Sequence, residues 1–160
     1  MKKPFALAMS VVVIWLSGCA HAPARTAAPS GQINWYRLSE GERIAKQEKK
    51  PMVVDFASGA GCPRCEAMGK GAYKDPGVIS MLNKDFVPIK IDLDKPITSE
   101  ELALGNRFGF RQDCLLLFLD YNGNPIADPV EGKLCFVDVV NAKDFRKYLI
   151  DALRNMNAGK

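Results

Sequence analysis

Histidine is almost missing from this sequence, since His21 is the only one among 160 residues. This scarcity argues against a Cys–His hydrolase and against a histidine-rich metal site, because each needs histidine beside other reacting or ligating groups. A second closely spaced cysteine pair is also missing: only Cys62 and Cys65 lie near each other among the five cysteines. A zinc ribbon needs two such pairs and is therefore disfavoured.

A strong excess of one charge is lacking as well. The chain has 22 basic and 18 acidic side chains, a net charge of +4. Residues 1–18 contain Lys2 and Lys3 and no acid, so the remainder has 20 basic against 18 acidic side chains, or +2. No basic run is interleaved with aromatic residues, and we therefore expect no nucleic-acid partner.

Long hydrophobic runs are limited to the beginning of the chain. Lys2 and Lys3 give the chain a basic start, and residues 5–16 form a mainly apolar core, which is too short for an ordinary spanning helix and typical of a secretory signal. It ends in Leu16-Ser17-Gly18-Cys19, which resembles the lipobox of bacterial lipoproteins. That resemblance implies cleavage before Cys19 and a diacylglycerol on its sulfur, which would attach the protein to a lipid bilayer. The alternative is an ordinary signal peptide with a chance cysteine.

The resemblance also implies where the protein resides. An exported, lipid-anchored chain would face the periplasm, and Ala20 stands where an aspartate would indicate inner-membrane retention. The outer membrane is favoured by this analogy. Residues 21–31 are rich in alanine, proline and serine, which is typical of a flexible tether.

Composition predicts one globular domain with appendages, because 48% of the residues are hydrophobic and 25% are charged. We assign residues 1–18 to a lipoprotein signal peptide, 19–33 to the lipid-anchored tether and 34–157 to the domain. A capping box at 39–42 predicts a helix to about 49, and a second capping signal at 98–101 predicts a helix to about 108. A helix is also expected from Pro63, weakening near Gly69 and Gly71. Two further helices are expected to begin at Asp75-Pro76 and at Asn141.

Strand signals alternate with the helical ones. We expect strands at 33–37, 52–57, 87–91 and 114–119 and, after a turn at Asn122-Gly123, from 126 to 130 or toward 140. The strand at 87–91 is expected to alternate between buried and exposed residues. In the last helix six apolar residues recur at helical spacing and are expected in the core: Phe145, Tyr148, Leu149, Ala152, Leu153 and Met156.

The most informative stretch runs from Met52 to Cys65. A buried strand at 52–57 and a glycine-containing turn at 58–61 lead into Cys62 and Cys65, which share one face if a helix begins there. A helix N-terminus lowers a cysteine pKa from about 8.5 to roughly 3.5–7.5, and Arg64 would add positive charge. The pattern predicts a redox pair in which Cys62 attacks and Cys65 resolves. The alternative is a purely structural disulfide.

The segment at 50–56, followed by Cys62-Pro63-Arg64-Cys65, resembles the thioredoxin superfamily. Residues 75–79 and 83–92 are similar to one branch, which contains the periplasmic C-terminal domain of DsbD-type electron transporters and related small thioredoxin-like lipoproteins. The resemblance covers about residues 34–155. It implies an α/β, thioredoxin-like fold with a central mixed β-sheet flanked by helices on both faces.

The resemblance also implies a role for Asp55, which matches the buried acid that helps to move the proton of Cys65. The other interpretation of Asp55 is a partly exposed acid at a strand end. The segment from Phe56 to Gly61 is one residue longer than the family pattern, and Gly61 stands where tryptophan is common. We therefore expect the cysteine pair to be more exposed than in the family.

A larger departure lies downstream, where Cys114 follows Asp113 at the position of the family's cis-proline. That residue packs against the two cysteines and presents backbone to a substrate chain, so the resemblance implies that Asp113 and Cys114 bind substrate. Cys114 and Cys135 either pair as a disulfide or remain two buried thiols that act as small hydrophobes. Sequence alone does not decide between these alternatives.

Three functions follow from these residues. The favoured one is a membrane-anchored thiol–disulfide oxidoreductase that acts on protein thiols and disulfides without a cofactor, in the reducing direction, with electrons from a DsbD-type membrane donor. The second is soft-metal binding by three or four thiolates, motivated by the missing cis-proline. The third is a non-catalytic binding module with the same fold.

Overall fold

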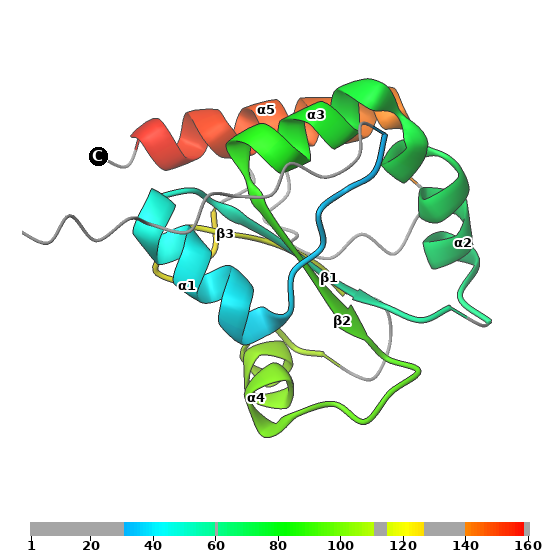
Figure 1. Ribbon diagram of the computed structural model, residues 1–160, viewed down its shortest axis with the longest axis vertical. Coiled ribbons are helices and arrows are strands. Elements are labelled where there is room, and N and C mark those ends of the chain that lie inside the picture. Colours follow the sequence, from blue (N-terminus) through cyan, green and yellow to red (C-terminus); the bar gives the residue numbers. More distant parts are fainter. Residues whose placement is uncertain (1–30, 60, 111–114, 127–139, 159–160) are drawn as a thin grey trace, which may run out of the picture.

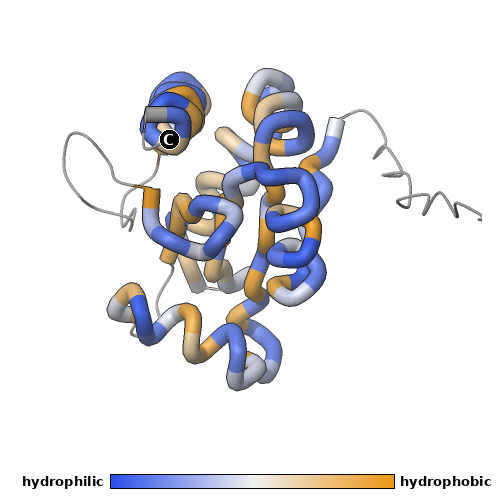
Figure 2. Tube along the Cα trace, turned by 90° about the vertical axis from the view of Figure 1, so that its left-hand side faces the viewer, coloured by the Kyte–Doolittle hydropathy of each residue, from blue (hydrophilic) through white to orange (hydrophobic). Residues whose placement is uncertain are grey.

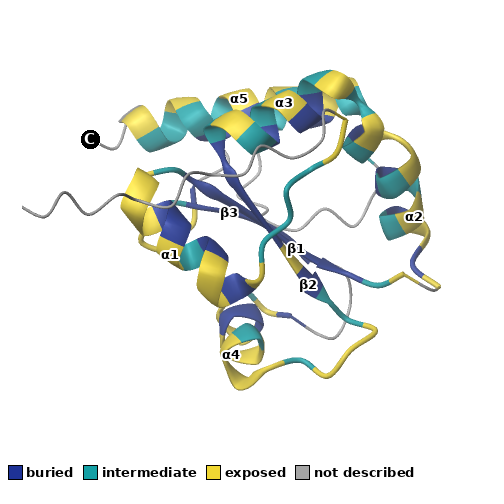
Figure 3. Ribbon diagram, viewed as in Figure 1, coloured by how far each residue is buried: buried dark blue, intermediate teal, exposed yellow. Residues whose placement is uncertain are grey.

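A computed structural model describes residues 31–59, 61–110, 115–126 and 140–158. Within these ranges, three strands form one mixed sheet in the order β2-β1-β3 (Figure 1). The central strand β1 (Met52–Ala57) pairs in parallel with β2 (Val87–Asp92) and antiparallel with β3 (Leu115–Leu119). Every residue of β1 and β3 is buried, as expected for strands covered on both faces (Figure 3).

Helices cover both faces of this sheet. Val54 and Phe56 of β1 pack on one side in a core shared with α1 (Leu38–Glu48) and α4 (Ser99–Arg107). Val53 faces the other side, in a core shared with α2 (Pro63–Lys70), α3 (Pro76–Asp85) and α5 (Ala142–Ala158). Apolar residues accordingly concentrate at the strands, between the helical layers (Figure 2). The predicted α/β fold is confirmed.

Three of the predicted helix starts have the expected capping bonds. At α4, the Glu101 amide donates to Thr98 Oγ1 at 3.2 Å and the Thr98 amide donates to Glu101 Oε2 at 2.9 Å, which forms a capping box. The Asp75 carboxylate accepts from the Val78 amide at 2.9 Å, and Asn141 Oδ1 accepts from the Asp144 amide at 2.9 Å. Local sequence signals therefore fix where these helices begin.

The capping box predicted at residues 39–42 is wrong. Helix α1 begins at Leu38, and Arg37 is its N-cap without a side-chain capping bond, so Ser39 lies inside the first turn. Because Leu38 is buried, with 5% of its surface exposed, the helix begins one residue before the capping signal at Ser39. Gly41 follows on the buried face, where an added Cβ would overlap the Ile89 side chain.

The strand predicted at 33–37 is wrong in extent, since the segment makes only one isolated parallel bridge, between Tyr36 and Ile89. The alternation predicted for β2 is also wrong: only Lys90 of this strand is exposed, because helices cover both faces. The turn at Asn122-Gly123 is confirmed, and the Ile126 amide donates to the Phe118 carbonyl at 2.9 Å. The rest of the predicted returning strand, up to residue 139, lies outside the described residues.

The predicted core face of α5 is confirmed. Phe145, Leu149 and Ala152 are buried, and Tyr148, Leu153 and Met156 pack against them as partly buried side chains. Helices α3 and α5 lie side by side over this face of the sheet (Figure 1). In the described part of the chain, no helix is both long enough and apolar enough to cross a membrane.

Candidate functional site

The two closely spaced cysteines form a disulfide at the beginning of α2. Cys62 and Cys65 are bonded through sulfur, with their Cα atoms 5.3 Å apart. Cys62 is the N-cap of the helix, Pro63 occupies its first turn, and the Cys65 amide donates to Cys62 Sγ at 3.1 Å. The helix start therefore directs an N–H group and the positive end of its dipole at this sulfur, the arrangement that stabilises a thiolate after reduction.

A clamped turn leads into Cys62. Asp94, from the loop after β2, accepts hydrogen bonds from Ser58 Oγ and from the Gly59 amide, both at 2.6 Å. Gly61 has φ +77°, a left-handed conformation that favours glycine and lets the chain reverse into α2. The longer turn noted in the sequence is thus held by a side chain 35 residues away from Gly59.

The two cysteines differ in burial, and the expectation that the pair is more exposed than in the family stays a prediction. Cys62 is 9% exposed and Cys65 is half-buried. Arg64 and Met68 lie on the inner face of α2 and are 5% and 1% exposed, respectively. These two side chains hold the helix against the sheet and draw its N-cap inward. Cys62 still contacts solvent, through a small part of its surface.

Asp55 lies in the middle of β1 and is 2% exposed. The sequence left open whether Asp55 is a buried acid or a partly exposed one at a strand end, and in the structure it is buried. Arg64 Nη2 donates to Asp55 Oδ1 at 3.0 Å, and Tyr73 Oη donates to Asp55 Oδ2 at 2.7 Å. One side chain from β1, one from α2 and one from the short 3-10 helix η1 (Ala72–Lys74) thus form a buried polar cluster, called here the Asp55 cluster.

Burial dominates the electrostatics of the Asp55 cluster. It raises the pKa of Asp55 above the usual value for an aspartate, while Arg64, the Tyr73 hydroxyl and Lys90 each act in the opposite direction. The pKa of Tyr73 is raised well above 10.0 by burial and by the nearby Asp55 charge, so this hydroxyl keeps its proton. A buried carboxylate with a raised pKa is a stronger base than an exposed one, which favours the uptake of a proton from a neighbouring acid.

Arg64 does not act as the sequence suggested. Its side chain points inward to Asp55, and its Nε and Nη1 atoms are buried with no hydrogen-bond partner among the described residues. Asp55 therefore compensates the charge that we had assigned to the Cys62 thiolate. An arginine between two cysteines, near a buried acid in sequence, is a signal that could have revealed this pair. Tyr73 was missed, and nothing in its local sequence marks it.

The remaining predicted site residues, Asp113, Cys114, Cys135 and Cys19, lie outside the described residues. The proposed Cys114–Cys135 contact and the soft-metal alternative both depend on them. Within the described ranges, no group of three histidine, cysteine, aspartate or glutamate side chains is arranged to hold a metal ion.

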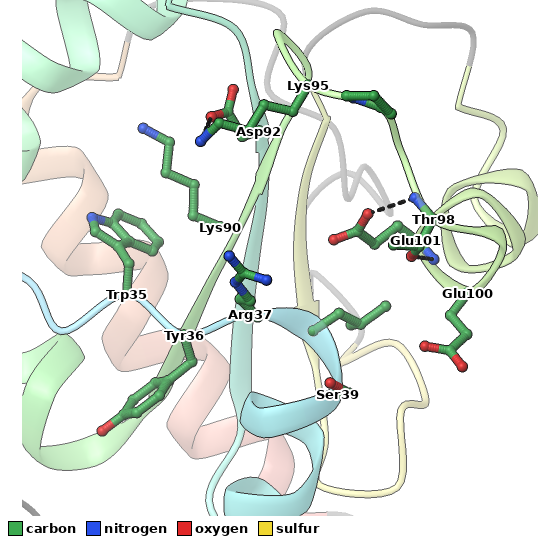
Figure 4. A pocket seen from close by; sticks show the side chains of 12 residues that line it. Trp35, Tyr36, Arg37, Ser39, Lys90, Asp92, Lys95, Thr98, Glu100 and Glu101 are labelled. Atoms are coloured by element: carbon green, nitrogen blue, oxygen red, sulfur yellow. Dashed lines mark hydrogen bonds and ion pairs between the residues drawn. The ribbon is translucent and has the colours of Figure 1, made fainter.

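A separate hollow of about 390 Å³ lies between the segment before α1 and the loop that leads into α4 (Figure 4). Its lining carries both signs of charge, since Arg37 and Lys90 are basic and Glu100 and Glu101 are acidic. Neither cysteine of the disulfide lines it. This hollow is therefore distinct from the redox pair.

The arrangement defines a class of protein. A mixed sheet covered on both faces, with a CxxC disulfide at the start of the helix that follows its central strand, is a thioredoxin-like fold carrying a dithiol–disulfide pair. This confirms the superfamily that the sequence resembles.

Comparison with known families is consistent with this class. A family model described as "Thioredox_DsbH: Protein of unknown function, DUF255" matches residues 22–101, which is half of the 160 residues. The chain belongs to this family. Comparison with curated proteins gives no match.

Solved structures share the fold at low sequence identity. The structure titled DsbH Oxidoreductase is 16% identical, with a TM-score of 0.60 over 83% of this chain and 93% of that one. A thioredoxin from Thermus thermophilus is 23% identical, with a TM-score of 0.59 over 81% and 94%. The reduced C-terminal domain of Neisseria meningitidis DsbD is 19% identical, with a TM-score of 0.56 over 71% and 91%.

Proposed function

We propose that this protein is a thiol–disulfide oxidoreductase whose reacting groups are Cys62 and Cys65. The observation that carries the proposal is the placement of Cys62 as the N-cap of α2, with the Cys65 amide donating to its sulfur. A purely structural disulfide does not need a helix N-terminus directed at one of its sulfurs. The family match and the solved oxidoreductases of the same fold support this proposal.

The reaction uses two exchange steps. In the reduced protein the Cys62 thiolate attacks a sulfur of a partner protein's disulfide, which forms a mixed disulfide and releases the partner's other sulfur as a thiolate. The Cys65 thiol then loses its proton to Asp55 and attacks Cys62 Sγ. The partner leaves as a dithiol, the Cys62–Cys65 disulfide forms, and two electrons have passed to the partner.

Two matched variants test this division of labour with insulin reduction by dithiothreitol as the assay. Cys62→Ser removes the attacking sulfur and should abolish both turnover and the mixed disulfide. Cys65→Ser removes only the resolving sulfur and should abolish turnover; reduced beforehand and mixed with insulin after the dithiothreitol is removed, it should trap insulin on Cys62, detected by mass spectrometry. If both variants reduce insulin as fast as the unchanged protein, the assignment is wrong.

We further propose the reducing direction, with electrons from a DsbD-type membrane donor. The measurement is the reduction potential of the Cys62–Cys65 couple against glutathione. A value near that of thioredoxin, about −270 mV, supports a reductase, whereas one near that of the strong oxidant DsbA, about −120 mV, overturns the direction.

We also propose a lipid anchor on Cys19 and a location at the periplasmic side of a membrane, the outer membrane being favoured. The motif at residues 16–19 supports this proposal. Expression of the full chain with labelled palmitate should label the protein and retain it in the detergent phase. Cys19→Ala should lose the label, and an unlabelled parent protein would contradict the anchor.

A further inference from the structure

The Asp55 cluster contains a charge that the two exchange steps do not use. Arg64 is 5% exposed, and a guanidinium stays protonated at any physiological pH. Its Nη2 atom lies 3.0 Å from Asp55 Oδ1, whereas Nε and Nη1 have no partner among the described residues. The ion pair with Asp55 is therefore the only compensation the described structure gives this buried charge, and a buried charge without compensation is strongly unfavourable.

The same ion pair fixes how Asp55 lies. Arg64 takes Oδ1 and the Tyr73 hydroxyl takes Oδ2, so the carboxyl group has one donor on each oxygen and cannot rotate freely. Arg64 also stands directly before Cys65 in the chain, on the first turn of α2. A single residue thus connects the orientation of the acid to the helix that carries the resolving sulfur.

We propose that Arg64 is a positioning residue, which keeps Asp55 oriented and able to ionise so that this acid can take the proton of Cys65 in the resolving step. The proposal rests on the oxidoreductase function above. In this step the Cys65 S–H bond breaks, its proton passes to the Asp55 carboxylate, and the resulting thiolate forms the bond to Cys62 Sγ as the partner's sulfur leaves with its electron pair.

The charged and titratable groups around Asp55 come from three elements. Arg64 on α2, Tyr73 on η1 and Lys90 on β2 face it, and its register partner on β3 is the apolar Leu116. Tyr73 keeps its proton, and Lys90 is exposed, where solvent weakens its effect. Arg64 therefore has the largest effect among the groups that oppose burial in setting the pKa of Asp55, and its removal leaves only the Tyr73 hydroxyl and Lys90 to oppose it.

The test compares Arg64→Met with Lys70→Met. Both remove one positive charge from α2 and leave a side chain of similar length, but Lys70 is 79% exposed and pairs with Glu66 on the surface. The resolving rate is measured against pH, by following decay of a mixed disulfide preformed on Cys62. Arg64→Met should slow decay at neutral pH, about tenfold for each unit by which the Asp55 pKa exceeds the working pH, with recovery in alkali. Lys70→Met should follow the unchanged protein.

A second readout does not depend on activity. Carbon-13 NMR of the Asp55 carboxyl should give a titration midpoint that moves upward in Arg64→Met and not in Lys70→Met. Arg64→Lys, which keeps a charge, should leave the midpoint close to that of the unchanged protein and retain most of the resolving rate. If Arg64→Met does not fold, Arg64→Lys and Arg64→Gln keep the test decisive, because at neutral pH Arg64→Lys should behave like the unchanged protein and Arg64→Gln should not.

The two proposals fail differently. If the Asp55 midpoint moves as expected but the unchanged protein does not reduce insulin and Cys65→Ser traps none of it on Cys62, the control of Asp55 by Arg64 stands and the oxidoreductase function falls. If insulin is reduced and Arg64→Met shows the same pH profile and the same midpoint as Lys70→Met, the positioning role of Arg64 is overturned.

Discussion

Helix α2 carries two ion pairs that have the same length and differ in burial. Arg64 pairs with Asp55 at 3.0 Å, and the two side chains are 5% and 3% exposed. Lys70 pairs with Glu66, also at 3.0 Å, and these side chains are 79% and 52% exposed. Distance alone does not separate them. The comparison teaches that burial, and the element from which the acid comes, decide what an ion pair does in this fold.

The largest difference in stability between disrupting the two ion pairs should come from Asp55→Ala. It leaves the Arg64 guanidinium buried without its acid, and we expect a loss of about 3–5 kcal/mol in the free energy of unfolding. Guanidinium denaturation measures this value. Replacing both members, Asp55→Asn with Arg64→Met, should recover most of the loss, because no uncompensated charge remains. A double variant as unstable as Asp55→Ala would show that the charge is not the cause.

Tyr73→Phe tests the other bond to Asp55 and should have the next largest effect. The hydroxyl donates to the carboxylate at 2.7 Å, and loss of a hydrogen bond to a charged group costs about 1.5–3 kcal/mol. Tyr121→Phe is the matched control, since Tyr121 packs in the core on the opposite face. Equal losses in the two variants would assign the effect to tyrosine removal in general.

The dependence of stability on pH also distinguishes the buried ion pair from the exposed one. Burial raises the pKa of Asp55 in the folded protein above its usual value of 3.8. At pH values between 3.8 and the folded pKa, the folded protein therefore binds a proton that the unfolded chain has released. The contribution of Asp55 to stability is then present below 3.8 and is lost as pH rises through the folded pKa. Urea denaturation at successive pH values should show the unchanged protein losing stability relative to Asp55→Asn as pH rises. Parallel curves would contradict a raised pKa.

Glu66→Ala should have the smallest effect. The pair that it breaks is solvated, and exposed pairs at this helical spacing contribute about 0.3–0.5 kcal/mol. Added salt should reduce the difference from the unchanged protein further, because it screens exposed charges. Thermal unfolding at low and high salt measures both quantities. A loss comparable with that of Asp55→Ala would remove the distinction between the two pairs.

Local signals predicted much of this fold. Thr98, Asp75 and Asn141 cap helices where their side chains indicated, and the strand before Cys62 lies in the centre of the sheet. Ser39 misled because its capping preference of about 1 kcal/mol is outweighed when Leu38 is buried one residue earlier. Signals that act within one turn of a helix are reliable only where the neighbouring burial agrees with them.

The candidate site was predicted only in part. The cysteine pair and the buried acid could be proposed from residues close in sequence. The bond from Tyr73 to Asp55 joins residues 18 apart on different elements, and the clamp of Asp94 on Gly59 spans 35 residues. Such contacts depend on how the helices dock on the sheet, which local patterns do not specify. The inward direction of Arg64 likewise follows from the packing of α2.

The aromatic neighbours of the Asp55 cluster have an optical consequence. The Trp35 ring lies 5.2 Å from that of Tyr73, edge to face, and Tyr73 lies 5.9 Å from Phe145. The chain has two tryptophans, and the other, Trp15, falls in residues 1–18, which we propose are a signal peptide. The mature domain would then contain a single indole, in contact with the tyrosine that binds the acid. Its emission would be a label-free gauge of whether the cluster is intact.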